Sequence, residues 1–234
     1  MKKLLLALLF LTGCTGPGPV YRIGVDPELP ESDFKKRDYI LGYVQELLLK
    51  MSKRENIQFE VVQVGGMGLL DELKSEKLDA AISSISPHNF NESTYDFSEG
   101  FLKLGPVLVL NQKSPTRNLK DLDGKVVGLL MEDPSILIVE NYPKVITRSY
   151  ETLRDLFKAL SERQIDALIV GRIDAISFMG KEMKIEGEPL NDRSLRFITN
   201  HEQNRRLMSS FDRVISRLTK ESKLRSLQKK WSLD

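Results

Sequence analysis

Apolar residues recur along this chain in short blocks that predict strands and helices in turn. Three runs rich in β-branched and aliphatic residues predict strands, at residues 21–25, 57–64 and 79–82. Two runs with apolar residues at helical spacing predict helices, at residues 41–51 and 69–73. Breaks at Asp26-Pro27 and Gly65-Gly66 end the first two strands. A strand, helix and strand in this order are typical of a parallel, doubly wound sheet.

A second series of the same kind occupies the middle of the chain. It predicts strands at residues 125–130, 145–147 and 167–170, and an amphipathic helix at residues 151–162. When Asp166 is aligned with Asp79, Leu156 falls on Leu69 and Ile165 on Leu78. Any junction between a helix and a strand can give such a pattern by itself. Together with the strand order, however, the pattern favours two similar α/β lobes.

The end of the chain predicts two further helices and no sheet. Residues 207–218 are amphipathic, and residues 222–231 form a second, basic helix. A run of charges on a terminal helix is usually a solvated face, so we expect no membrane or nucleic-acid role here.

The first residues have the features of a secretion signal. Lys2 and Lys3 precede an apolar run at residues 4–11, which is far shorter than the ~20 residues that span a bilayer. The sequence Leu11-Thr12-Gly13-Cys14 resembles the bacterial lipobox, whose cysteine is acylated and becomes the new N-terminus. Cys14 is the only cysteine, so no internal disulfide can form. We expect a lipid anchor at Cys14 and a location in the periplasm or at the cell surface; the alternative is an ordinary signal peptide that contains a cysteine.

Charge and histidine content argue against several classes of protein. The chain has 35 basic and 33 acidic residues, and loss of Lys2 and Lys3 with the signal balances them. A balanced chain lacks the clustered basic charge that binds nucleic acid. The two histidines, His88 and His201, lie far apart and fit no catalytic triad or metal spacing. We therefore expect no metal, no cofactor and no enzymatic activity.

Several motifs, taken in order, resemble the type II periplasmic solute-binding proteins, in particular the polar amino-acid family of ABC transporters. They are residues 21–26, 41–43, 77–82, 95–98, 119–128, 164–169 and 229–231. The resemblance implies an α/β fold of two doubly wound lobes joined by two crossing hinge strands. It implies a monomer that captures a small-molecule ligand between its lobes and presents it to an ABC permease.

The resemblance also implies a division of the chain. Residues 1–13 would be the signal peptide and residues 14–19 a lipidated tether. The first lobe would comprise residues 20–107 with 199–234, and the second residues 112–194. The hinges would lie at about 107–111 and 195–199.

The family's clamp for an α-amino acid is largely missing at the matching positions. Asn91 takes the place of the arginine that grips the ligand carboxylate, and Gly171 that of the acid that binds the ammonium group. Asp133-Pro134 stands where the second lobe offers hydroxyl groups, next to Ser135. Leu29 and Gly66 replace two large rings, which favours a roomier pocket. An asparagine can donate a hydrogen bond to a carboxylate but supplies no charge.

Two interpretations of this loss remain open. The ligand is not a simple α-amino acid, or the clamp is rebuilt from Arg172, Asp174, Glu28 or Asp26. The serines after the third strand can bind ligand or simply cap the next turn. The predicted ligand-binding residues are Asp26, Leu29, Gly66, Ser84, Ile85, Ser86, Asn91, Asp133, Ser135, Gly171 and Arg172.

The expected function is ligand capture for an ABC importer, with an amino acid, a derivative such as cystine or glutamine, or another small polar solute as ligand. The alternative is a lipoprotein of the same fold that senses a ligand or binds a partner. A dehydratase-like enzyme is the third possibility, for which the sequence offers no positioned nucleophile, base or metal site.

Overall fold

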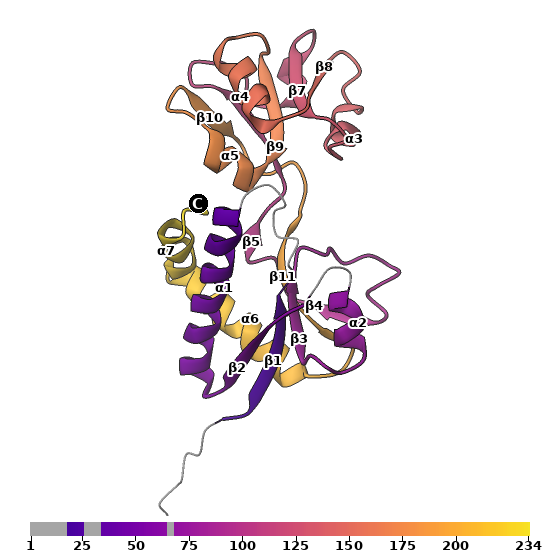
Figure 1. Ribbon diagram of the computed structural model, residues 1–234, viewed down its shortest axis with the longest axis vertical. Helices are drawn as coiled ribbons and strands as arrows, with labels where there is room; N and C mark the ends of the chain where they lie inside the picture. Colours follow the sequence, from indigo (N-terminus) through magenta and orange to yellow (C-terminus); the bar gives the residue numbers. More distant parts are fainter. Residues whose placement is uncertain (1–17, 26–33, 65–67) are drawn as a thin grey trace, which may run out of the picture.

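The computed structural model describes residues 18–25, 34–64 and 68–234, arranged as two lobes stacked along the long axis of the molecule (Figure 1). Each lobe is built on its own sheet. The strand order is β2-β1-β3-β11-β4 in the first sheet, where β5 also pairs with β11, and β10-β6-β9-β7-β8 in the second. The predicted fold class, two α/β lobes, is therefore confirmed.

The first sheet joins strands from both ends of the chain. Its strands are β1 (Val20–Val25), β2 (Gln58–Gln63), β3 (Ala80–Ser83), β4 (Tyr95–Phe97), β5 (Leu102–Lys103) and β11 (Ser194–Asn200). The strands β1, β2 and β3 are parallel, as their separation by helices requires. The strand β11 runs antiparallel beside β3, so the sheet is mixed and not purely parallel.

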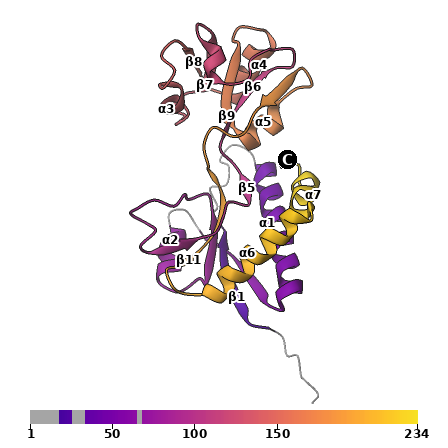
Figure 2. The same cartoon turned by 180° about the vertical axis from the view of Figure 1, so that it is seen from behind.

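Helices cover both faces of this sheet. They are α1 (Phe34–Glu55), α2 (Leu69–Lys74), α6 (Arg205–Lys220) and α7 (Lys223–Lys230). Ile23 and Phe197 are fully buried in one apolar cluster with residues of α1, α6 and α7, whereas Ala81 and Ile198 are buried in another with residues of α2. Figure 2 shows α6 lying across the sheet and α7 next to α1.

Two sequence motifs nearly 190 positions apart meet where α7 packs on α1. A Cβ atom at Gly42 would lie only 2.3 Å from the ring of Trp231. The indole Nε1 of Trp231 donates a hydrogen bond to Glu46 Oε2 at 3.1 Å. Gly42 is therefore the position on α1 that lets the tryptophan approach, and the terminal helix is part of the first lobe.

The second sheet has the same plan. Its strands are β6 (Pro106–Asn111), β7 (Val126–Leu130), β8 (Ile146–Tyr150), β9 (Ala167–Gly171) and β10 (Met183–Glu186), and the elements around it are η2 (Leu119–Leu122), α3 (Ile136–Val139), α4 (Leu153–Ser161) and α5 (Arg172–Phe178). The helix α4 packs on one face through Leu156 and Leu160, and η2 and α3 on the other through Leu122 and Val139.

The predicted echo between the two halves appears as two matching sets of contacts. The backbone N–H groups of Arg22 and Val126 donate to one carboxylate oxygen of Asp79 and Asp166, at 2.7 and 2.8 Å. A Cβ at Gly24 would lie about 2.5 Å from Leu69 and Leu78, and a Cβ at Gly128 equally close to their counterparts Leu156 and Ile165. The alignment of Asp79 with Asp166 thus describes a repeated strand, helix and strand.

The chain passes between the lobes twice, and the two passages lie side by side. One runs from β5 to β6 and the other from β10 to β11, and Lys103 pairs with Ser194 where they meet. The segments 107–111 and 195–199, predicted as hinges, form the bodies of β6 and β11. A hinge is defined by motion, so its position and the lobe boundaries stay predictions.

The predicted signal peptide and most of the predicted tether lie outside the described residues. Within the described ranges, no helix is both long enough and apolar enough to span a membrane.

Candidate functional site

Both sheets turn the carboxyl ends of their parallel strands toward the other lobe (Figure 1). The region between these two edges is called the gap. In the first lobe, β3 ends at Ser83, which pairs with Arg196 near the start of β11. In the second lobe, β9 ends at Gly171, which pairs with Pro106 at the start of β6. Ligands of open α/β sheets bind at this edge, because the loops and helix starts that follow the strands offer free polar groups there. The gap is therefore the candidate binding site.

The first lobe contributes the loop after β3. Ser84, Ile85 and Ser86 are each half-buried, and Ser83 beneath them is fully buried and accepts the N–H of Ile85 at 3.2 Å. The hydroxyl of Ser84 accepts a long hydrogen bond, 3.4 Å, from Nη2 of Arg193. The serines thus lie together at the predicted edge of the lobe, and Ser83 takes the turn-capping role.

Asn91 is a buried residue of the same loop. Its Oδ1 accepts the N–H of His88 at 2.8 Å, and its Nδ2 donates to the carbonyl of Ser86 at 3.0 Å. Both partners belong to the loop itself, so the asparagine amide fixes the path of the segment that carries Ser84 and Ser86. A direct contact between Asn91 and a ligand stays a prediction.

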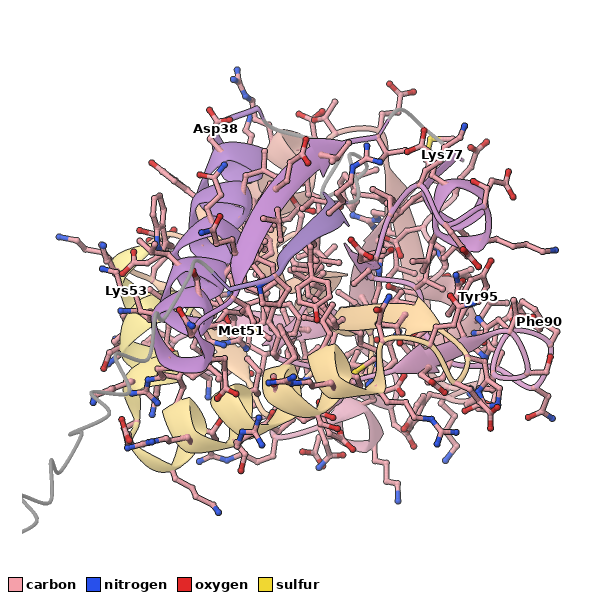
Figure 3. All side chains as sticks on the ribbon, turned by 90° about the horizontal axis from the view of Figure 1, so that it is seen from below. Asp38, Met51, Lys53, Lys77, Phe90 and Tyr95 are labelled. Carbon is pink, nitrogen blue, oxygen red and sulfur yellow. The ribbon has the colours of Figure 1, made fainter. Side chains whose placement is uncertain are left out.

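The tip of this loop carries an exposed aromatic residue. Phe90 is 79% exposed and stacks on His88 with a centroid separation of 5.4 Å. Figure 3 shows Phe90 at the outer edge of the molecule, on the opposite side of the first lobe from Met51 and Lys53 of α1.

The second lobe places Asp133 and Ser135 just before α3. Oδ1 of Asp133 accepts the backbone N–H of Ser135 at 2.7 Å, and Ser135 is buried. The start of α3 is therefore already served by a carboxylate of the chain. A ligand carboxylate placed there would be repelled by Asp133. Leu137, on the same short helix, is 64% exposed.

Gly171 and Arg172 lie at the junction of the two lobes. The nearest atom to a Cβ at Gly171 would be Oδ2 of Asp174 at 3.5 Å, which is ordinary contact. A methyl group would therefore fit at this position without a clash. The backbone N–H of Arg172 donates to the carbonyl of Gly105 in the first passage, at 3.2 Å.

A pocket of about 560 Å³ opens between the lobes on the side of α7. Lys103, Arg172, Glu188 and Gln228 are among its lining residues. Lys103 Nζ lies 2.6 Å from Glu188 Oε2, and this bond, with a smaller contribution from Arg172, lowers the pKa of the Glu188 carboxyl. The interlobe region thus carries charges from both lobes.

The structure brings the predicted residues together in two groups. Ser84, Ile85, Ser86 and Asn91 share one loop of the first lobe, while Asp133, Ser135, Gly171 and Arg172 follow strand ends of the second. Asp26, Leu29 and Gly66, with Glu28, lie outside the described residues. Sequence reasoning missed Arg193, because no pattern in the chain indicates that it lies next to Ser84.

The described residues offer no group of three or more histidine, cysteine, aspartate or glutamate side chains that could hold a metal ion. The histidines have local partners: His88 stacks on Phe90, and Nδ1 of His201 lies 2.8 Å from Asp96 Oδ1.

Two α/β lobes, joined by two adjacent passages and facing each other with their strand ends, define a two-lobed binding protein. The chain belongs to the bacterial extracellular solute-binding proteins, family 3, whose family model matches residues 21–234. The resemblance in the motifs is therefore confirmed, and the chain is a solute-binding protein.

Known relatives span most of the chain. The arginine-binding extracellular protein ArtP of Bacillus subtilis is 23% identical over 219 residues, covering 89% of this chain and 84% of that protein. The L-cystine-binding protein TcyJ of Escherichia coli is 24% identical over 217 residues, covering 89% and 81%. Among solved structures, the unliganded, open L-cystine solute receptor of Neisseria gonorrhoeae matches with a TM-score of 0.74 at 14% identity, covering 91% and 92%.

Proposed function

We propose that this protein captures an amino acid or a close derivative between its lobes and delivers it to an ABC permease. The observation that carries the proposal is the pair of polar strand ends, at Ser84–Ser86 and at Gly171-Arg172, that face one gap beside two adjacent passages. A gap of this kind can close around a small solute by rotation of the lobes. The family supports import as the purpose of capture.

The class of ligand follows from the relatives and from the site. ArtP and TcyJ are named for arginine and L-cystine, and both solutes carry α-carboxylate and α-amino groups. The side chains at the strand ends differ from the family's clamp, with Asn91 bound into its own loop and Asp133 bound to Ser135. The proposed ligand is therefore an amino acid held by a rebuilt set of polar groups.

The remaining features of the proposal concern the rest of the chain. Residues 1–13 are a signal peptide, and Cys14 carries a lipid that holds the protein at the periplasmic or outer face of a membrane. The protein acts as a monomer and has no catalytic role. The open arrangement of the lobes is the unliganded form, which the likeness to an open, unliganded receptor supports.

A melting experiment tests the proposal. The whole chain is purified in detergent, unfolded and refolded to remove carried-over ligand, and heated while the fluorescence of Trp231 is followed. The panel holds the twenty amino acids, cystine, dipeptides and organic acids. A ligand at a hundred times its Kd adds about 2.7 kcal/mol to the free energy of unfolding, which raises the melting temperature by about 5–10 °C for this size of chain. A panel in which no amino acid or derivative raises the melting temperature would contradict the proposal.

A further inference from the structure

Arg193 lies in the passage from β10 to β11, and its guanidinium group reaches the loop after β3. Its Nη2 donates to Ser84 Oγ at 3.4 Å, the long end of the range for such a bond. The residue is exposed, and among the described residues no carboxylate lies within ion-pair distance of it. A charged group thus rests on a neutral hydroxyl at the edge of the proposed binding site.

The backbone of Arg193 makes several short hydrogen bonds, whereas its side chain makes a long one to Ser84. Its carbonyl accepts the N–H groups of Leu104 and Gly105 at 2.9 and 3.0 Å, and its own N–H donates to Asn191 Oδ1 at 3.1 Å. The carbonyl of Gly105 in turn accepts the N–H of Arg172, the first residue of α5. Arg193 therefore touches both passages between the lobes and is one hydrogen bond removed from the second lobe.

The acids nearest to Arg193 along the passage are already paired with other cations. Glu188 is held by Lys103 at 2.6 Å, and Asp192 Oδ2 lies 3.7 Å from Nη2 of Arg196. Arg196 also donates to the carbonyl of Ser98, and its Nε is buried without a hydrogen-bond partner. Among the described residues of this passage, Arg193 is therefore the exposed cation without a carboxylate partner.

We infer that Arg193 binds the carboxylate of the solute, in the role that a charged residue at position 91 would otherwise have. The inference rests on the proposed function and names the group that anchors its ligand. Hydrogen bonds between ionised partners are roughly twice as strong as neutral ones, and a guanidinium can bind a carboxylate through two of them. A ligand carboxylate therefore displaces Ser84 as the partner of Arg193.

The position of Arg193 also connects binding to closure. The backbone of Arg193 is hydrogen-bonded to the first passage and, through Gly105, to the start of α5. A ligand bound to the Arg193 side chain is therefore linked to the segments that connect the lobes. The second lobe then closes over a ligand that Arg193 already binds at the edge of the first lobe. Solutes that carry a free carboxylate bind, and their carboxamides, which lack the charge, bind far more weakly.

The test compares acids with amides in wild type and variants, using the whole chain in detergent. The probe pairs are L-arginine with L-argininamide and L-histidine with L-histidinamide, extended to the acid and amide of whichever amino acid raises the melting temperature most. The variants are Arg193→Gln, which keeps a donor but loses the charge, and Arg193→Lys, which keeps the charge. The matched control is Arg148→Gln on the outer strand β8, where the side chain of Arg148 donates to the carbonyl of Gln164 at 3.4 Å.

Calorimetric Kd values give the outcome. We expect wild type and Arg148→Gln to prefer the acid, and Arg193→Gln to bind the acid about 10–100-fold more weakly with the amide unchanged, as for loss of one charged hydrogen-bond partner. We expect the Kd of Arg193→Lys for the acid to fall between the values of wild type and Arg193→Gln. This variant separates the loss of charge from general damage to the passage.

Two results would overturn the inference. If Arg193→Gln keeps the preference of wild type for the acid, another group anchors the carboxylate and the proposed function stands without Arg193. If wild type binds no amino acid at all, the proposed function itself fails, and this result is visible before any variant is made.

Discussion

The two lobes share a common frame, which is the repeated strand, helix and strand with matching contacts. They differ at the edges that face each other. In both, an aspartate before a central strand accepts a backbone N–H of the neighbouring strand, and a glycine on that neighbour packs against a leucine of the helix that precedes the central strand. Beyond the frame, the first lobe ends β3 in serines and a buried asparagine, while the second ends β9 in Gly171-Arg172. The fold thus fixes the position of the strand ends and leaves their side chains free to define the ligand.

The largest expected effect tests whether the shared frame is equally important in each lobe. Leu73 and Leu160 occupy matching positions and are both fully buried. Replacement of either by alanine removes buried methyl groups and leaves a cavity, so we expect each to lower the free energy of unfolding by about 2–5 kcal/mol. Urea denaturation followed by circular dichroism measures both losses. A loss below about 1 kcal/mol in one lobe alone would break the equivalence.

The paired aspartates give the next effect. Asp79→Ala and Asp166→Ala each leave one backbone N–H, of Arg22 or Val126, without its acceptor. We expect each to cost about 1–2 kcal/mol in urea denaturation. The asparagine variants retain an oxygen acceptor and serve as controls, so they should lose less. If the asparagine and alanine variants lose equal amounts of unfolding free energy, the negative charge of the aspartate, and not its hydrogen bond, is what stabilises the lobe.

The matching helices α2 and α4 differ at their starts, because only α4 has a side-chain cap. Thr152 accepts the N–H of Asp155 at 3.1 Å at the start of α4, whereas Gly68 at the start of α2 makes no such bond. Thr152→Ala should lower the melting temperature by the equivalent of about 1 kcal/mol, and Thr152→Ser should restore most of it. Gly68→Ala should change stability by no more than about 0.5 kcal/mol. A larger loss at Gly68 would indicate an unrecognised role for α2 at the gap.

The smallest expected effect is a pH dependence that Glu221 contributes in the first lobe. Hydrogen bonds from Lys223 and Arg217, and a weaker one from Arg54, lower the pKa of Glu221 from 4.5 to about 2. A carboxyl with a lowered pKa stabilises the folded state above its unfolded value, and this contribution is lost as the pH falls from 4.5 through 2. Fluorescence of Trp231, which directly follows α7, should report the loss, and Glu221→Gln should be less sensitive over this range. Because the group is at the surface, 0.5 M salt should weaken the effect. An acid transition unchanged by Glu221→Gln would assign it to other carboxyls.

Much of the fold could be predicted because it depends on local patterns. The periodicity of Leu153, Leu156, Phe157 and Leu160 located α4, and the run at residues 167–170 located β9. The start of α1 at Phe34 was missed, because charged residues surround the apolar positions of its first turns. The short strands β4, β5 and β10 have too few residues to show a period.

The candidate site was less predictable, because it depends on contacts between distant segments. The serines after β3 were expected at the gap from their strand alone. Nothing local shows that the amide of Asn91 is used by its own loop, or that Arg193 crosses to Ser84 over 109 positions. The bond between Asp133 and Ser135 spans only two residues and is local, whereas the repulsion of a ligand carboxylate by Asp133 stays a prediction.

Capture of the solute between the lobes is tested most directly by the distance between the lobes with and without ligand. Spin labels on cysteines introduced at Glu92 and Leu137, both exposed and on opposite lobes, report that distance in the whole chain. We expect a saturating amino acid from the melting panel to shorten this distance and narrow its distribution, because the lobes close on a solute in the gap. A ligand that raises the melting temperature and leaves this distance unchanged would contradict capture between the lobes.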